Sequence, residues 1–203
     1  MNTQLTERLN KILPTITQPG FLSGEGIGSE IACHIFDYPA EHELQVREHL
    51  ALMEIHFQRH HPQMKVLHLN LFDVVRDYLS DRGYLEKALA MQESKGDAGV
   101  LKALRGPVSS EKVRDFIAGH HQLSSQNLVL LSGVGSIWPM LRAHSLLNCL
   151  HTIMGKTPLV MFYPGVFDGT TLRLFGRISP KTAKAGTKPY YRAFSLVPST
   201  RQS

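Results

Sequence analysis

The chain has 203 residues, 42% of them hydrophobic, which is enough to bury the core of one domain. It contains no run of 18 consecutive apolar residues, and its polar N-terminal segment lacks the apolar region of an export signal. We therefore expect no membrane span and a cytoplasmic location. Cys33 and Cys149 each lie in an apolar segment, which favours buried free thiols over a disulfide.

The net charge of +5 is concentrated at the C-terminal end. Residues 171–203 hold seven basic and no acidic side chains, so the rest of the chain carries a net charge of −2. Such a basic region can bind nucleic acid or an acidic protein, or it can be a solvated loop. If DNA is bound, directly or indirectly, the candidate side chains are Arg173, Arg177, Lys181, Lys184, Lys188 and Arg192.

The chain begins with a predicted amphipathic helix over residues 3–15. A first strand is predicted at 31–36, and a helix follows it through about Arg59. The glycine-rich stretch at 24–28 precedes a strand rather than a helix, so we interpret it as a lead-in and not as a phosphate loop. The apolar side of the first helix is formed by Leu5, Leu9, Ile12 and Ile16.

The junction between the first strand and its helix reads DYPAEHE, residues 37–43. In a nucleotide-binding α/β domain this turn holds phosphates through glycines, a lysine and free backbone N–H groups. Here the turn is acidic and has neither glycine nor lysine, so it is expected to repel phosphate.

A second short strand is predicted at 66–69, and the next fifty residues contain no strand pattern. That length far exceeds a minimal crossover of about a dozen residues, so we predict a helical insertion over about 71–120. The helices expected there cover residues 71–79, 84–91, 99–104 and 110–118.

The strongest pattern lies between residues 126 and 165. Residues 128–131 and 159–163 are apolar without interruption, which is typical of strands buried on both faces of a parallel sheet. A helix between them is predicted to begin at Pro139 and to end at Gly155. This strand–helix–strand unit predicts a right-handed parallel crossover. The predicted apolar stripe of the helix consists of Met140, Ala143, Leu147, Leu150 and Met154.

The C-terminal part predicts further strands. Asp168-Gly169 favours a reversal into an antiparallel strand at 171–175, and residues 190–197 alternate like a last edge strand. We therefore predict one α/β domain over residues 1–203, with a mainly parallel sheet flanked by helices and a C-terminal antiparallel edge.

The loop at Gly133 and Gly135 follows a strand, as a nucleotide-binding loop does. It lacks a third glycine, no Gly-Lys-Ser/Thr follows, and Ser132 stands where a magnesium-holding acid is expected. Ser132 also lacks the flanking glycines of a nucleophile elbow. We interpret the glycines as a tight turn against the neighbouring strand.

Metal chemistry has two possible sources in the sequence. His42, His49 and His56 recur every seven residues, about 10.5 Å apart on a helix, which is too far for one ion, so no histidine metal site is predicted. Asp37 and Asp73 each follow a strand and could hold Mg²⁺ for phosphoester hydrolysis. Strand-ending aspartates are also common turn residues.

Five stretches of the chain resemble the BrxB family, a component of the bacterial BREX anti-phage defence system. The most specific are LSGVGSxxPxLR, from residue 131, and PLVMFYPGxxDGxxLRLFG, from residue 158. Ala32-Cys33-His34 departs from the more apolar first strand expected of the family. The stretches cover residues 35–50, 67–75, 128–150, 157–176 and 190–198.

The resemblance implies an accessory protein rather than a catalyst. BREX systems methylate host DNA and block phage replication, and the family is expected to assemble with the phosphatase-like PglZ protein, the BrxC ATPase and the PglX methyltransferase. It implies a degenerate P-loop-NTPase-like core, with no cofactor and no catalytic residues to carry over.

We therefore predict a non-enzymatic scaffold that contacts a PglZ-type protein through residues 133–142 and 163–169. The alternatives are a metal-dependent phosphoesterase or nuclease that uses the two aspartates, and a DNA-binding module that uses the basic C-terminal region. Trp138 could instead cap the core. The predicted contact residues, all of types common in interface hot spots, are Trp138, Arg142, Tyr163 and Phe167.

Overall fold

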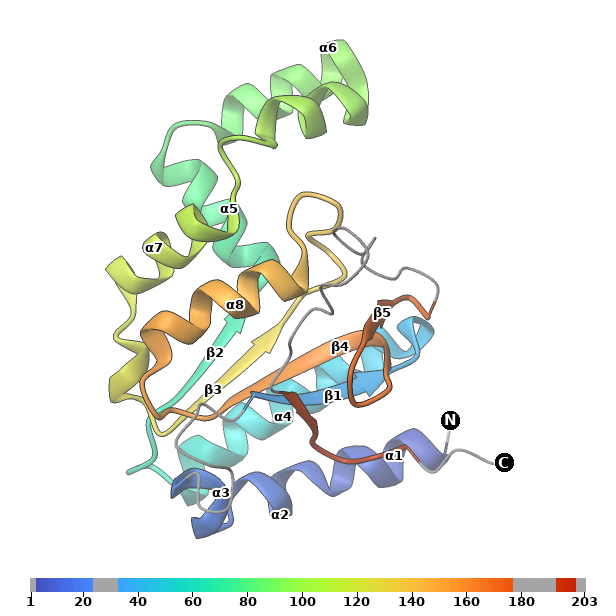
Figure 1. The fold of residues 1–203 in the computed structure, drawn as a ribbon, viewed down its shortest axis with the longest axis vertical. Helices are drawn as coiled ribbons and strands as arrows, with labels where there is room; N and C mark the ends of the chain where they lie inside the picture. The colour runs from blue at the N-terminus through green and yellow to red at the C-terminus, as the bar shows by residue number, and fades with distance from the viewer. Residues whose placement is uncertain (1–2, 24–32, 177–192, 200–203) are drawn as a thin grey trace.

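Figure 1 shows the computed structural model, which describes residues 3–23, 33–176 and 193–199. The sheet has the spatial order β2-β3-β4-β1-β6, and every neighbouring pair along this order is parallel. The α/β class with a mainly parallel sheet is thus confirmed. The strands of this order are β1 (Cys33–Tyr38), β2 (Val66–Asn70), β3 (Leu128–Ser132), β4 (Leu159–Phe167) and β6 (Ala193–Ser195).

The C-terminal edge agrees with the prediction only in part. The hairpin is confirmed: β5 (Leu172–Leu174) runs antiparallel to the end of β4, with Phe167 opposite Leu172. The last strand is not antiparallel, because β6 runs parallel to β1 with Ala193 opposite Cys33. β5 therefore pairs at the carboxyl end of β4, whereas β6 begins beside the amino end of β1.

Two layers of helices cover the sheet (Figure 1). On one face, α1 (Thr3–Asn10), α2 (Ile12–Ile16) and α4 (Glu43–His60) share a core cluster with Phe36, Leu130 and Phe162 of the strands. The predicted N-terminal helix is thus broken at Lys11, but its predicted apolar side is confirmed. Leu5, Leu9, Ile12 and Ile16 are all at most 3% exposed.

The opposite face carries the helical insertion and α8 (Ala143–Met154). The insertion is confirmed as α5 (Leu71–Asp81), α6 (Leu85–Leu104) and α7 (Ser110–His120). Gly96, with φ 64° and ψ −177°, divides α6 into two helical segments, as the two separate predictions at 84–91 and 99–104 anticipated. Both segments extend away from the body of the domain in Figure 1.

Short helices complete the described chain: α3 (Pro19–Ser23) and the 3-10 turns Ala40–His42 and Leu123–Ser125. None of the helices in the described ranges is both long and apolar enough to cross a membrane.

The start of α8 differs from the prediction. The helix begins at Ala143 rather than at Pro139, because Val134, Ile137 and Leu141 are buried and hold the preceding residues against the core as a series of turns. The buried stripe also differs from the prediction, because Leu147 is only partly buried. The buried residues of α8 are Leu146, Leu150 and Met154.

Candidate functional site

The carboxyl ends of β1, β3 and β4 lie at one edge of the sheet, where open α/β domains usually bind ligands. The register places Asp37 of β1 opposite Tyr163 of β4, and Asn70 of β2 opposite Ser132 of β3. These residues, with the loops that follow them, form the candidate site.

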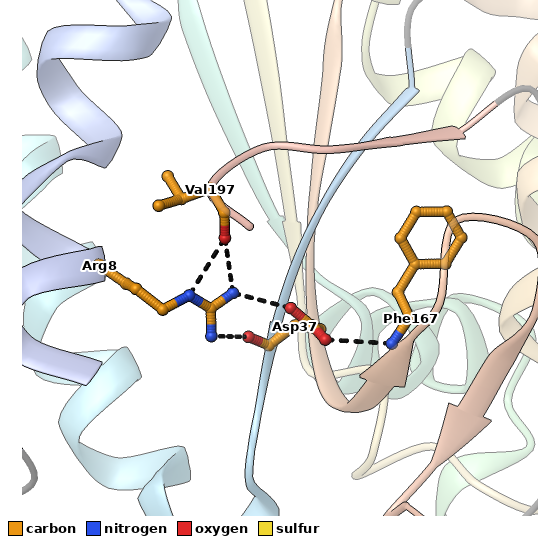
Figure 2. A network of polar contacts seen from close by, with 4 residues as sticks. All are labelled: Arg8, Asp37, Phe167 and Val197. Atoms are coloured by element: carbon orange, nitrogen blue, oxygen red, sulfur yellow. Dashed lines mark hydrogen bonds and ion pairs between the residues drawn. The ribbon is translucent and has the colours of Figure 1, made fainter. Parts of the chain in front are cut away.

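Asp37 is the centre of a buried polar network (Figure 2). Its Oδ1 lies 2.7 Å from Nη2 of Arg8, its Oδ2 accepts a hydrogen bond from the N–H of Phe167, and the two charged side chains are only 9% and 10% exposed. Arg8 also donates to the carbonyls of Asp37 and Val197, and its guanidinium lies over the ring of Phe36. The network joins α1, β1, the end of β4 and the segment after β6, so both carboxylate oxygens of Asp37 have internal partners.

Asp73 lies elsewhere. It occupies the first turn of α5, half-exposed, and its carboxylate is 2.8 Å from Nη1 of Arg76. β3 and β4 separate β1, which carries Asp37, from β2, which precedes Asp73, so these two strands are about three strand spacings, roughly 14 Å, apart. The predicted pairing of these two aspartates is therefore wrong. Within the described ranges, no group of three or more His, Cys, Asp or Glu residues is placed to hold a metal ion.

A second network was not predicted. Nε2 of His68 lies 2.7 Å from the hydroxyl of Ser132, and Nδ1 of the same ring lies 2.6 Å from Oε1 of Glu54. The order serine, histidine, carboxylate is that of a hydrolase triad. Ser132, however, is 5% exposed and ends a strand whose residues are all buried. The network joins α4 to β2 and β3. The sequence signal for it is one polar residue in each apolar strand, His68 within β2 and Ser132 at the end of β3.

The glycine loop is confirmed as a tight turn against the neighbouring strand. Gly133 has φ +72°, and a Cβ at this position would collide with Oδ1 of Asn70. A Cβ at Gly135 would lie 3.0 Å from the ring of Pro164 and 3.1 Å from that of Phe175. The loop after β3 thus packs closely against both β2 and the β4–β5 hairpin.

This packing brings two exposed aromatic rings together. Trp138 is 42% and Phe175 is 39% exposed, and their rings meet edge to face with centroids 6.3 Å apart. We call these two residues, with the exposed Arg142 of the same loop, the aromatic surface. The sequence analysis missed Phe175, which lies in the turn directly after β5 with φ 53° and is exposed, whereas Leu172 and Leu174 are buried.

The predicted contact set needs a correction. Tyr163 and Phe167 are 3% and 7% exposed, so they belong to the core and not to an accessible surface. Tyr163 packs in the cluster beneath α8, and Phe167 closes the β4–β5 hairpin. Trp138 and Arg142 are exposed, as the prediction required.

Among the predicted nucleic-acid contacts, only Arg173 is described; its guanidinium lies 3.8 Å from the carboxylate of Asp168. The others, Arg177, Lys181, Lys184, Lys188 and Arg192, lie outside the described residues.

Comparison with known proteins decides the family. The family model described as BREX protein BrxB matches residues 67–196, which include the aromatic surface, most of β2 and all of β3, β4, β5 and β6. The chain belongs to the BrxB family. BREX protein BrxB of Escherichia coli O9:H4 (strain HS) is 42% identical over 196 residues, covering 97% of this chain and 93% of that protein.

BREX protein BrxB of Bacillus cereus (strain H3081.97) is 35% identical over 196 residues, covering 96% of this chain and 98% of its own length. No solved structure matches the chain. The resemblance to BrxB drawn from the sequence motifs is confirmed, and with it membership of the BREX phage-defence system. A BrxB protein therefore acts alongside other BREX components.

Proposed function

We propose that this BrxB-family chain is a non-enzymatic scaffold of a BREX complex, and that its aromatic surface binds a PglZ-type protein. Further members of the complex would be the BrxC-type ATPase and the PglX-type methyltransferase. The observation that carries the proposal is the pair of exposed rings of Trp138 and Phe175 at the carboxyl edge of the sheet.

The aromatic surface has the features of an interface hot spot. Tryptophan and arginine are enriched in hot spots, and a large ring held in place before binding loses little conformational entropy. Trp138 is held by its contact with Phe175, and its loop is fixed by the close approach of Gly133 to Asn70. Nη2 of Arg47 also donates to the hydroxyl of Ser136, which ties the loop to α4.

The surrounding polar groups support a role other than nucleotide chemistry. Asp37 is neutralised by Arg8, and the β1–α4 junction carries Glu41 and Glu43 where a phosphate loop has glycine and lysine. A parallel strand joined by a short loop to a helix, as β1 is joined to α4, is the frame on which a P-loop is built. We therefore propose a degenerate P-loop-like core that has lost its phosphate site and serves as a platform.

Co-purification with a PglZ-type protein from the same operon tests the proposal. Trp138→Ala should weaken binding by about tenfold or more, because truncation of a central aromatic costs about 2 kcal/mol, and Phe175→Ala and Arg142→Ala should each weaken it less. Phe194→Ala is the matched control, since Phe194 is 44% exposed but pairs with His34 near the opposite end of β1. Unchanged recovery of the PglZ-type protein with folded Trp138→Ala would refute the proposed surface.

A separate experiment tests whether the chain is an enzyme. The hydroxyl of Ser132 is buried, so a fluorophosphonate probe should leave the protein unlabelled, and DNA should stay intact with Mg²⁺ or Mn²⁺. Labelling that disappears in Ser132→Ala, or DNA cleavage that disappears in Asp37→Asn, would contradict the non-enzymatic proposal.

A DNA-binding role for the basic C-terminal region is the second candidate, favoured by the charge excess of residues 171–203. It predicts an affinity for DNA that falls steeply with salt, and a flat response would discard it.

A further inference from the structure

Helix α4 carries apolar side chains on two opposite faces. Val46, Leu50, Met53 and Phe57 are at most 4% exposed and pack against the sheet. On the opposite side, Leu44, Leu52 and Ile55 are 71%, 64% and 43% exposed. One face is sufficient to fix a helix on a sheet, so the outer leucines and isoleucine need a different explanation.

Four exposed residues on the outer face form a continuous line, which we call the α4 seam: Glu48, Leu52, Ile55 and Arg59. Their spacings of four, three and four residues are those of the contact positions in paired helices. The seam is acidic at its N-terminal end, apolar in the middle and basic at its C-terminal end. Within the part of the chain that the structure describes, neither Glu48 nor Arg59 forms an ion pair.

This order of charges makes the seam complementary to itself in one orientation. When two copies of α4 run antiparallel, Glu48 of one lies opposite Arg59 of the partner subunit, and Leu52 lies opposite Ile55 of the partner subunit. Both contacts then occur twice about a two-fold axis, which is the arrangement of an isologous dimer. A parallel pair would instead place like charges together, which is unfavourable.

We propose that the α4 seam binds the α4 seam of a second copy of this chain, giving a two-fold dimer with antiparallel α4 helices. The proposal is independent of the PglZ-binding surface, because α4 covers the face of the sheet opposite α8 (Figure 1). The apolar centre consists of two leucine–isoleucine pairs, so a dissociation constant in the micromolar range is expected rather than a permanent dimer.

Sedimentation velocity of the full chain over a concentration series measures the dimer directly. Leu52→Glu should raise the dimer dissociation constant at least tenfold, since it buries two carboxylates in the apolar centre of the interface, where the wild type places two leucines. The matched control is Leu89→Glu on α6, where a leucine of 53% exposure lies far from the seam and the dimer should be unchanged.

A charge exchange tests the antiparallel register. Glu48→Arg and Arg59→Glu should each be monomeric alone, because every cross-pair becomes a like-charge pair. When the two variants are mixed, both cross-pairs are attractive again, so a heterodimer should form. The folding of each variant is checked by circular dichroism.

The dimer is refuted if the wild type stays monomeric at about 0.1 mM, where a micromolar dimer is assembled. It is also refuted if Leu52→Glu dimerises like the wild type. Failure of the mixed charge variants to associate refutes the antiparallel register. The wild type could be monomeric and co-purify with another BREX protein that Leu52→Glu no longer binds. That result would refute the dimer and identify the other BREX protein as the partner of the α4 seam.

Discussion

Two regions of the sheet contain polar side chains, and these side chains differ in burial and in hydrogen-bond partners. In β1, Asp37 and its partner Arg8 are at most 10% exposed, and His34 of the same strand is 7% exposed with an Nε2 that has no hydrogen-bond partner. At the β2–β3 edge, His68 is paired on both ring nitrogens, while the Glu54 side chain at the end of that network is 42% exposed. Because the cost of an unpaired polar group rises with its burial, we expect the Arg8–Asp37 pair to contribute more to the free energy of unfolding than the His68–Glu54 pair.

The largest effect is expected at Arg8. Arg8→Met keeps the aliphatic length but leaves the Asp37 carboxylate buried without its cation, which should lower the free energy of unfolding by about 3–5 kcal/mol. Urea denaturation monitored by circular dichroism measures it. Arg47→Met is the control, because the Arg47–Glu43 pair has side chains 48% and 25% exposed and should contribute less than about 1 kcal/mol.

A second variant separates charge from packing. Adding Asp37→Asn to Arg8→Met removes the unpaired charge and should restore part of the lost stability. If the double variant is no more stable than Arg8→Met alone, the loss comes from the hydrogen bonds of Arg8 to the carbonyls of Asp37 and Val197 and not from the buried carboxylate.

The next effect is a pH dependence from His34, whose ring packs against those of Phe21 and Phe194. Burial lowers the pKa of His34 from the ordinary 6.5 to about 4. Between these values the unfolded chain binds the proton and the folded chain does not, so folding stability falls as the pH drops from 6.5 towards 4. This histidine should account for up to about 3 kcal/mol of the loss.

His34→Leu removes the titrating group, and the leucine side chain fills the space between the rings of Phe21 and Phe194. The free energy of unfolding of the variant, measured at several pH values from 7 to 4, should decline less than that of the wild type. Parallel pH profiles for the two proteins would show that His34 is not protonated preferentially in the unfolded chain.

The sequence predicted the frame of the fold because its signals are local. The uninterrupted apolar residues at 128–131 and 159–163 identify buried parallel strands whatever surrounds them. The direction of β6 was not predictable in this way, because it depends on which end of the sheet the chain returns to. Likewise, whether Phe167 or Phe175 is exposed depends on what packs against the hairpin, since Phe167 ends β4 and Phe175 directly follows β5.

The polar networks could not be predicted from local sequence patterns, because their members are far apart in the sequence. Arg8 and Asp37 are 29 positions apart, and His68 and Ser132 are 64 apart. Asp37 could be recognised as a strand-ending aspartate, but only the packing of α1 on β1 shows that its partner is an arginine and not a metal ion. Arg8 also lies on the apolar side of α1. The apolar pattern predicts this helix, but it does not predict the ion pair between Arg8 and Asp37.

A smaller effect is expected at Ser132. Ser132→Ala removes one hydroxyl from a buried strand end and leaves one nitrogen of His68 without its partner, so it should lower the free energy of unfolding by about 1 kcal/mol. Ser136→Ala is a suitable control, because its hydroxyl is exposed. Urea denaturation of both variants checks the prediction. If the free energy of unfolding is nearly unchanged in both, the Ser132–His68 contact does not stabilise the fold.

The smallest effect is expected at Glu54, at the exposed end of the same network. Glu54→Gln keeps an acceptor oxygen within reach of Nδ1 of His68 and removes only a charge that is 42% exposed, so the free energy of unfolding should fall by about 0.5 kcal/mol. The change should shrink further at 1 M salt, where an exposed interaction is screened and the Arg8–Asp37 pair is not. A loss as large as that of Arg8→Met would overturn the rule drawn from comparing the two regions, because a partly exposed carboxylate would then matter as much as a buried one.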